Sequence, residues 1–180
     1  MGDPILSLGS ALMLACVFLA ASVHKLRDLR HFETTLGAYG LLPGMLVRPA
    51  ALGLPLMEFM VALGLLAPPA RFSAAMATAV LLGIYTLAIG INMARGRRSI
   101  DCGCGDPGRG QTLTGWLLPR NGVLMGLALL AATPVVNRTT GWLDWLVALL
   151  AAAAMLLLYS ACNQLLSNRD QLVNLRRSHA

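Results

Sequence analysis

Cys102 and Cys104, two cysteines one residue apart, are the residues whose types and spacing most directly suggest chemistry. They lie in the polar, glycine-rich stretch Asp101-Cys102-Gly103-Cys104-Gly105. Because a thiolate is both a nucleophile and a soft-metal ligand, the pair predicts either a redox couple or two metal ligands. A Cys-X-Cys disulfide is small and strained, and strained, exposed disulfides tend to be the labile, catalytic ones. A zinc site needs about four N or S ligands, and no second pair at matching spacing exists, so we expect a redox pair and no metal.

Glu58 is the one charged residue in an otherwise apolar stretch, where an ionised carboxylate is costly. We expect it to face the interior of a helix bundle and to be protonated, paired or both, with Lys25 or His24 as partner. Two readings stay open: a proton carrier coupled to redox chemistry, or a polar contact that holds two helices together. His24 could shuttle a proton, although a histidine beside Lys25 is more often an interfacial contact.

The two remaining cysteines, Cys16 and Cys162, lie inside long apolar segments. Isolated cysteines in helices are usually small apolar packing residues. We therefore expect them to be dispensable for redox chemistry.

The composition is that of a membrane protein. Hydrophobic residues make up 57% and charged residues 12% of the 180 residues, against about 45–50% and about 25% in soluble domains. The net charge of +6 could suggest nucleic-acid binding, but the charges fall at the ends of apolar segments, where membrane topology signals belong. We therefore expect the lipid bilayer as a partner and no nucleic acid.

The apolar runs predict an all-α, polytopic transmembrane bundle of about five helices in a single domain, because a crossing needs about 20 residues. The fourth run is short and contains Pro134, so a re-entrant or tilted segment is its alternative. The first run has no positively charged flank before it, which favours a retained helix over a cleaved signal peptide. The expected spans are 4–23, 49–70, 72–94, 121–137 and 145–168, with the cysteine loop at 95–120.

Five crossings distribute the basic residues very unevenly between the two sides of the membrane. By the positive-inside rule the N-terminus then lies outside, and the cysteine loop and C-terminus lie in the cytoplasm. One side carries Arg71 and Arg138, and the other carries Lys25, Arg27, Arg30, Arg48, Arg95, Arg97, Arg98, Arg109, Arg120, Arg169, Arg176 and Arg177.

Several of these residues occur in an order that resembles the methylamine utilisation protein MauE family, within a wider MauE/DoxX membrane group. The resemblance covers about 23–129 and is weak in the last helix. Its most specific part is the cysteine stretch with Arg120-Asn121 downstream. The other matching positions are Lys25-Leu26-Arg27-Asp28, Phe32, Tyr39-Gly40-Leu41-Leu42-Pro43, Pro55, Glu58, Asn92 and Arg95-Gly96.

The resemblance implies a multi-pass protein of the bacterial inner membrane that is needed to mature methylamine dehydrogenase. It implies a thioredoxin-like partner resembling MauD, and the disulfide-rich small subunit of the dehydrogenase as client. No cofactor is evident, and a quinone is a candidate only by analogy with other disulfide-forming membrane proteins. Client disulfides form in the periplasm, whereas the charges place Cys102 and Cys104 in the cytoplasm. Either electrons cross the membrane, the loop folds back, or the topology is reversed.

We therefore expect a membrane thiol–disulfide redox protein that exchanges electrons through Cys102 and Cys104. Two alternatives remain. One is a transporter of a soft metal or a small thiol that uses the pair as ligands. The other is an assembly factor that holds a client without redox chemistry.

Overall fold

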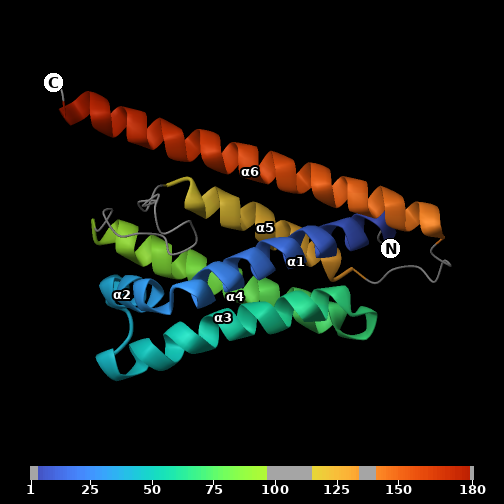
Figure 1. The fold of residues 1–180 in the computed structure, drawn as a ribbon, viewed down its shortest axis with the longest axis horizontal. Coiled ribbons are helices and arrows are strands. Elements are labelled where there is room, and N and C mark those ends of the chain that lie inside the picture. The colour runs from blue at the N-terminus through green and yellow to red at the C-terminus, as the bar shows by residue number, and fades with distance from the viewer. Residues whose placement is uncertain (1–3, 97–114, 134–140, 179–180) are drawn as a thin grey trace.

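The computed structural model describes residues 4–96, 115–133 and 141–178, with side chains described to residue 166. Cys102 and Cys104 lie outside the described residues. Throughout the described part the chain is helical and has no strand, which confirms the all-α class (Figure 1). Its elements are α1 (Pro4–Arg27), α2 (Leu29–Tyr39), α3 (Gly44–Leu66), a 3-10 helix (Pro68–Ala70), α4 (Arg71–Ala94), α5 (Leu117–Ala131) and α6 (Trp142–Ser178).

Four of the described helical segments are long and apolar enough to cross a membrane: Ile5–Arg27, Gly44–Leu66, Pro68–Ala94 and Trp142–Leu166. The fifth, α5, has 15 residues and spans about 22 Å at about 1.5 Å per residue, less than the hydrocarbon core of about 30 Å. Its two ends still contact residues near opposite ends of the bundle. Leu117 at its start packs against Tyr39 of α2, and Ala131 at its end accepts a hydrogen bond from Ser7 of α1 at 3.2 Å. The chain direction therefore alternates through five helices.

α1 continues to Arg27 and α6 covers Trp142–Ser178, so both are longer than the expected spans 4–23 and 145–168. Prolines account for the bounds of α3 and α5 that differ from the expected spans. α3 begins at Gly44 and carries Pro49 inside it, where the sequence suggested a start; transmembrane helices tolerate internal proline. α5 begins at Leu117, with Pro119 in its first turn, where the missing N–H has no intrahelical partner to lose. It ends at Ala131, ahead of Pro134, because a residue before proline is disfavoured in the helical region.

The short helix α2 lies between the expected spans 4–23 and 49–70, in a stretch to which the sequence pattern assigned no helix. The carboxylate of Asp28 caps its first turn by accepting from the His31 N–H at 3.0 Å. Gly40 ends the helix in the left-handed region at φ 61°. α2 buries Phe32 and Tyr39 against the bundle. It therefore closes one end of the bundle, beside the C-terminal end of α1 and the start of α3 (Figure 1).

α1 is the central helix, and it packs against α3, α5 and α6. Small residues allow this close packing, as is usual where lipid gives helices no hydrophobic drive to associate. A Cβ added at Gly64 of α3 would lie 2.8 Å from the Cβ of Ala74 in α4, so only glycine fits there. Gly9 of α1 faces Ala148 and Ala151 of α6, where an added Cβ would lie at ordinary contact distances of 3.5 and 3.6 Å.

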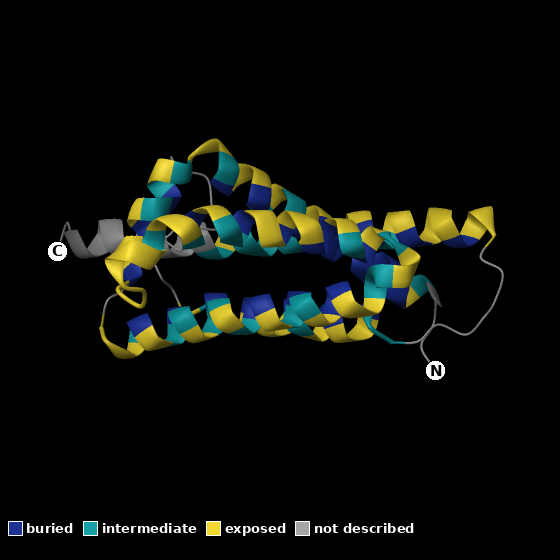
Figure 2. Cartoon of the chain, turned by 90° about the horizontal axis from the view of Figure 1, so that it is seen from below, coloured by how far each residue is buried: buried dark blue, intermediate teal, exposed yellow. Residues whose placement is uncertain are grey.

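The outward faces of the helices are apolar. Figure 2 shows exposed residues covering these faces while buried residues turn inward. In an 18-residue apolar stretch of α6 only 11% is buried within the protein, against 56% in the corresponding stretch of α1. Contiguous exposed apolar surface marks contact with another phase or partner, and on helices of this length that phase is lipid.

Basic residues gather at one end of the bundle. The end of α1, α2, the start of α3, the end of α4 and the start of α5 share this end, whereas Arg71 opens α4 at the other (Figure 1). The described basic residues at the shared end are Lys25, Arg27, Arg30, Arg48, Arg95 and Arg120.

Candidate functional site

Lys25 of α1 and Glu58 of α3 form an ion pair between Nζ and Oε1 inside the bundle. The side chains are only 4% and 2% exposed, respectively. Sequence reasoning placed Glu58 inside a span with Lys25 or His24 as its partner; in the structure the partner is Lys25. A charge buried this deeply needs such a partner, because desolvating it alone costs several kcal/mol.

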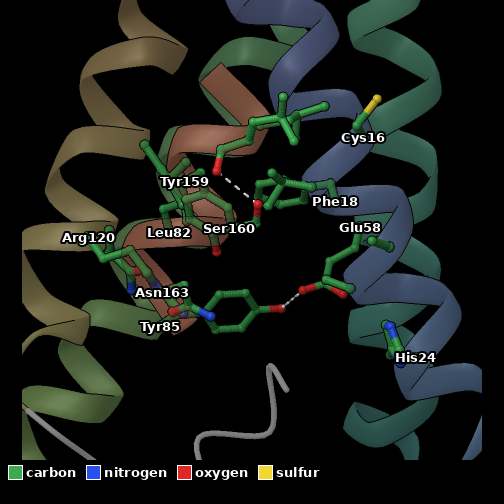
Figure 3. A pocket seen from close by; sticks show the side chains of 17 residues that line it. Cys16, Phe18, His24, Glu58, Leu82, Tyr85, Arg120, Tyr159, Ser160 and Asn163 are labelled. Atoms are coloured by element: carbon green, nitrogen blue, oxygen red, sulfur yellow. Dashed lines mark hydrogen bonds between the residues drawn. The ribbon is translucent and has the colours of Figure 1, made fainter. Parts of the chain in front are cut away.

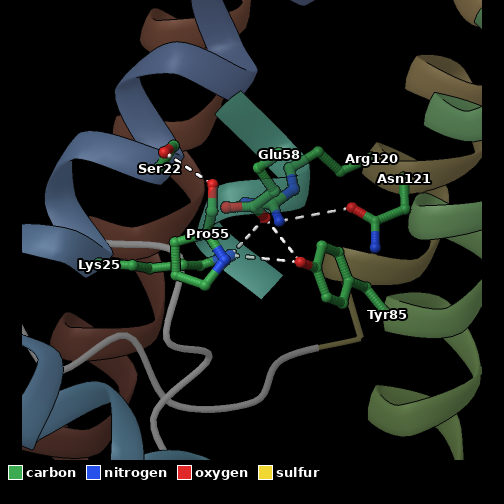
Figure 4. A network of polar contacts seen from close by, with 7 residues as sticks. All are labelled: Ser22, Lys25, Pro55, Glu58, Tyr85, Arg120 and Asn121. Carbon is green, nitrogen blue, oxygen red and sulfur yellow. Dashed lines mark hydrogen bonds and ion pairs between the residues drawn. The ribbon is translucent and has the colours of Figure 1, made fainter. Parts of the chain in front are cut away.

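Tyr85 of α4 joins the pair and ties a third helix to it (Figure 4). Its hydroxyl donates to Glu58 Oε1 at 2.7 Å and lies 3.5 Å from Lys25 Nζ. The ammonium also lies 4.8 Å from the centroid of the Tyr85 ring and 5.1 Å from that of Phe32, within cation–π range. We refer to Lys25, Glu58 and Tyr85 as the ion-pair cluster.

A backbone contact of α3 fixes where Glu58 lies along the neighbouring helix α1. Pro55 lies one turn before Glu58, and its carbonyl accepts from the Ser22 hydroxyl of α1 at 2.9 Å. Ser22 and Lys25 are three residues apart and therefore share one face of α1. The Ser22–Pro55 bond thus fixes the register in which Lys25 meets Glu58.

A second buried polar group lies on α5. Arg120 and Asn121 are both buried, and Asn121 Oδ1 accepts from the Arg120 guanidinium at 3.4 Å. Asn121 Nδ2 donates to Thr86 Oγ1 of α4 at 3.2 Å, and Arg120 Nη1 lies 3.5 Å from Asn163 Oδ1 of α6. The sequence placed Arg120 at the end of the cysteine loop; the structure places it inside α5.

A cavity of about 430 Å³ lies between the two polar groups (Figure 3). Glu58 and Tyr85 line it from the ion-pair cluster, and Arg120, Asn121 and Asn163 line it from the other side. The remaining walls are mostly apolar and come from α1, α4, α5 and α6. They consist of Cys16, Val17, Phe18, Ala20, Ala21, His24, Leu82, Leu124, Leu156, Leu157, Tyr159 and Ser160.

His24 lies on the cavity wall, one residue before Lys25 and outside the ion pair. Cys16 is an exposed free thiol on the same wall, so it is not the packing residue that its sequence context suggested. Cys162 is half-buried and free. Among residues 4–96, 115–133 and 141–166, no three His, Cys, Asp or Glu side chains come together in a way that could hold a metal ion.

The cysteine loop connects to the bundle near these groups. The chain leaves α4 at Arg95 and enters α5 at Leu117. Leu117 packs against Tyr39 and Ile89, and Met93 packs against the same small cluster. Arg120 follows within the first turn of α5, so both connections of the loop lie at the end of the bundle that holds the polar groups.

Sequence reasoning missed the cavity and most of its polar lining. Tyr85 stands in an uncharged span, and Asn163 stands in an apolar one, so neither forms a motif. The signal for Arg120-Asn121 was present, because these residues belong to the pattern that resembles MauE, but their burial was not evident.

Tyr85 also lines a second cavity of about 290 Å³ with Lys25 and Phe32, so the ion-pair cluster lies between two cavities.

Comparison with known proteins agrees with the resemblance. The family model described as methylamine utilisation protein MauE matches residues 3–134. Methylamine utilization protein MauE of Paracoccus denitrificans is 37% identical over 91% of this chain and 88% of its own length. The protein of that name from Methylorubrum extorquens is 36% identical over 89% and 88%. A third, from Methylophilus methylotrophus, is 42% identical over 57% of this chain and 54% of its own length.

No solved structure matches the chain. The family match, the coverage of the relatives and the helical membrane architecture point the same way. The chain therefore belongs to the MauE family of methylamine utilisation proteins.

Proposed function

We propose that this protein is a membrane thiol–disulfide redox protein that assists maturation of methylamine dehydrogenase, with Cys102 and Cys104 as its redox pair. The observation that carries the proposal is the Cys102-Gly103-Cys104 stretch in the connection between α4 and α5. Family membership supports the metabolic context, since the relatives are methylamine utilisation proteins. The client would be the small subunit of the dehydrogenase.

Exchange with a thioredoxin-like partner resembling MauD would run through a mixed disulfide. One thiolate of the pair attacks a disulfide sulfur, or receives such an attack, and the other cysteine resolves the adduct. The small ring of a Cys-X-Cys disulfide favours turnover, because strained disulfides are readily reduced. Two cysteines in one short loop therefore suffice for a complete exchange cycle.

Within this proposal Glu58 carries a proton. Its carboxylate accepts from Tyr85 and pairs with Lys25, and it lines the cavity between the helices. Intramembrane carboxylates that face a cavity commonly serve as proton relays. Thiol oxidation releases protons, so a titratable group at the same end of the bundle has a use in the cycle.

Trapping the mixed disulfide tests the proposal. We expect Cys102→Ser or Cys104→Ser, co-expressed with a partner that lacks its own resolving cysteine, to accumulate a covalent adduct that dithiothreitol releases. The double variant Cys102→Ser/Cys104→Ser is the matched control and should form none. Absence of an adduct from both single variants would contradict the exchange mechanism.

The proposed location is the bacterial inner membrane, with the N-terminus outside and the cysteine pair on the cytoplasmic side. Because the client disulfides form in the periplasm, this topology requires electrons to cross the membrane between the client and the pair. The gathering of basic residues at one end of the bundle supports it, since positively charged loops resist translocation. In a variant lacking Cys16 and Cys162, a membrane-impermeant maleimide should label Cys102 and Cys104 only after the cells are opened. Strong labelling of intact cells after mild reduction would show that the topology is the reverse of the proposed one.

A further inference from the structure

The cavity between α1, α4, α5 and α6 has a polar end and an apolar end. Glu58, Tyr85, Arg120 and Asn163 lie at the first (Figure 3), together with Asn121, which accepts from Arg120. Val17, Phe18, Leu124, Leu156 and Leu157 are among the apolar remainder. A volume of about 430 Å³ is within the range of small-molecule sites, about 300–1,000 Å³. Its polarity matches an amphiphile with a compact polar head and a hydrocarbon tail.

The mouth of this cavity lies on the membrane-facing side. Cys16 and Ala20 of α1, and Leu157 and Ser160 of α6, line it and are exposed. All four lie within helical segments apolar enough to cross the bilayer. A ligand that enters between α1 and α6 would therefore come from the hydrocarbon phase rather than from water.

The charges at the polar end favour a head group that accepts hydrogen bonds. Glu58 and Lys25 offset one another, and the Arg120 guanidinium adds a positive charge to the cavity wall. Arginine offers five N–H donors and no acceptor. Asn121 Nδ2 donates one N–H to Thr86 Oγ1 and carries a second N–H that can supplement the guanidinium. Carbonyl oxygens fit this end better than an ammonium or another donor.

We propose that the cavity binds a membrane-soluble quinone, with a ring carbonyl toward Arg120 and the isoprenoid or alkyl tail leaving between α1 and α6. Phe18, Tyr85 and Tyr159 provide aromatic walls for a flat ring. A fatty acid or phospholipid shares the acceptor oxygens and the tail. A quinone differs from these lipids because it can accept electrons from the two thiols. That part of the inference rests on the proposed redox function.

The redox step balances with the quinone as oxidant. The two thiols of Cys102 and Cys104 lose two electrons and two protons and form one S–S bond. The quinone gains two electrons and two protons and becomes the quinol, its two carbonyl oxygens becoming hydroxyls. The disulfide then takes two electrons and two protons from a dithiol of the thioredoxin-like partner. The partner's two sulfurs form an S–S bond, and Cys102 and Cys104 return to the dithiol form.

Binding can be measured without turnover. The probe is a decyl-substituted benzoquinone, titrated into purified full-length protein in nanodiscs, with dodecanoate as the lipid-type competitor. We expect saturable binding at one quinone per chain that dodecanoate displaces only weakly. Leu157→Trp, which fills the mouth from an exposed position, should weaken quinone binding at least tenfold.

Leu158→Trp is the matched control, because Leu158 is 66% exposed beside Leu157 at 71% but does not line the cavity. It should bind quinone as the wild type does. Equal binding by both tryptophan variants, or no saturable binding by the wild type, would overturn the site. Equal displacement by dodecanoate would identify a lipid site and overturn the quinone assignment.

A Cys102→Ser/Cys104→Ser variant separates this inference from the proposed function. We expect it to bind the quinone normally while the wild type alone reduces it when supplied with a reduced partner. If the wild type binds quinone but passes it no electrons, the proposed redox function fails and the binding site stands. Loss of binding in the double serine variant would contradict a site built from α1, α4, α5 and α6.

Discussion

A strain that lacks its own MauE and carries this chain with Cys102→Ser or Cys104→Ser is expected to grow on methylamine no better than the deletion strain. Either substitution leaves a single thiol in the loop, and one thiol can form a mixed disulfide but cannot resolve it. Active methylamine dehydrogenase should therefore fall to the level of the deletion strain. Growth on methylamine and dehydrogenase activity in extracts are the measurements.

The other two cysteines supply the control for that experiment. Cys16 lines the cavity, and Cys162 is half-buried in α6, and both are free thiols. The variant Cys16→Ser/Cys162→Ser should support growth as the wild type does. Full activity of a Cys102→Ser/Cys104→Ser protein would refute the redox function and leave an assembly factor as the better account.

Lys25→Met is expected to lower the stability of the folded bundle by about 3–5 kcal/mol, because it leaves the buried Glu58 carboxylate without its cation. The double variant Lys25→Met/Glu58→Gln should recover most of that loss, since it removes both charges and keeps an amide that can accept from Tyr85. The measurement is the unfolding midpoint in detergent mixed micelles with increasing dodecyl sulfate. Together with the single variant Glu58→Gln, these proteins form a double-mutant cycle. Its interaction energy gives the coupling between Lys25 and Glu58.

The same double variant separates the two readings of Glu58. If Glu58 carries a proton, Lys25→Met/Glu58→Gln should insert and fold yet fail to mature the dehydrogenase, because an amide does not titrate. Normal maturation by a stably folded double variant would reduce Glu58 to a polar contact between α1, α3 and α4. Additive destabilisation in the cycle would show that the ion pair contributes no coupling.

Much of this fold could be predicted from the sequence because bilayer thickness constrains helix length so strongly. The uncharged stretches before Lys25 and before Arg95 predicted α1 and α4 directly. The helix bounds near prolines could not be placed, because Pro49 is compatible with a helix start and with a helix interior. α2 was missed, because its buried residues Phe32, Thr35 and Tyr39 are interspersed with polar ones and the helix is too short to span.

The site was predictable only in part for a different reason. A lone carboxylate in an apolar span must be paired, and this requirement led to Glu58 and to Lys25 as one of its two candidate partners. No such requirement points to Tyr85 or Asn163, whose side chains are compatible with any interior position. Arg120 resembled a topology-setting cation beside the loop, and its burial depends on how α5 and α6 approach α1.

The most direct test of the redox function is the thiol state of Cys102 and Cys104 in living cells. Cells that carry the Cys16→Ser/Cys162→Ser protein would be quenched with acid, and free thiols would be tagged with a heavy maleimide before electrophoresis. If the pair is redox-active, it should shift between dithiol and disulfide when synthesis of the dehydrogenase small subunit and the thioredoxin-like partner is switched on. A pair that stays in one state, with or without client and partner, would contradict the redox function.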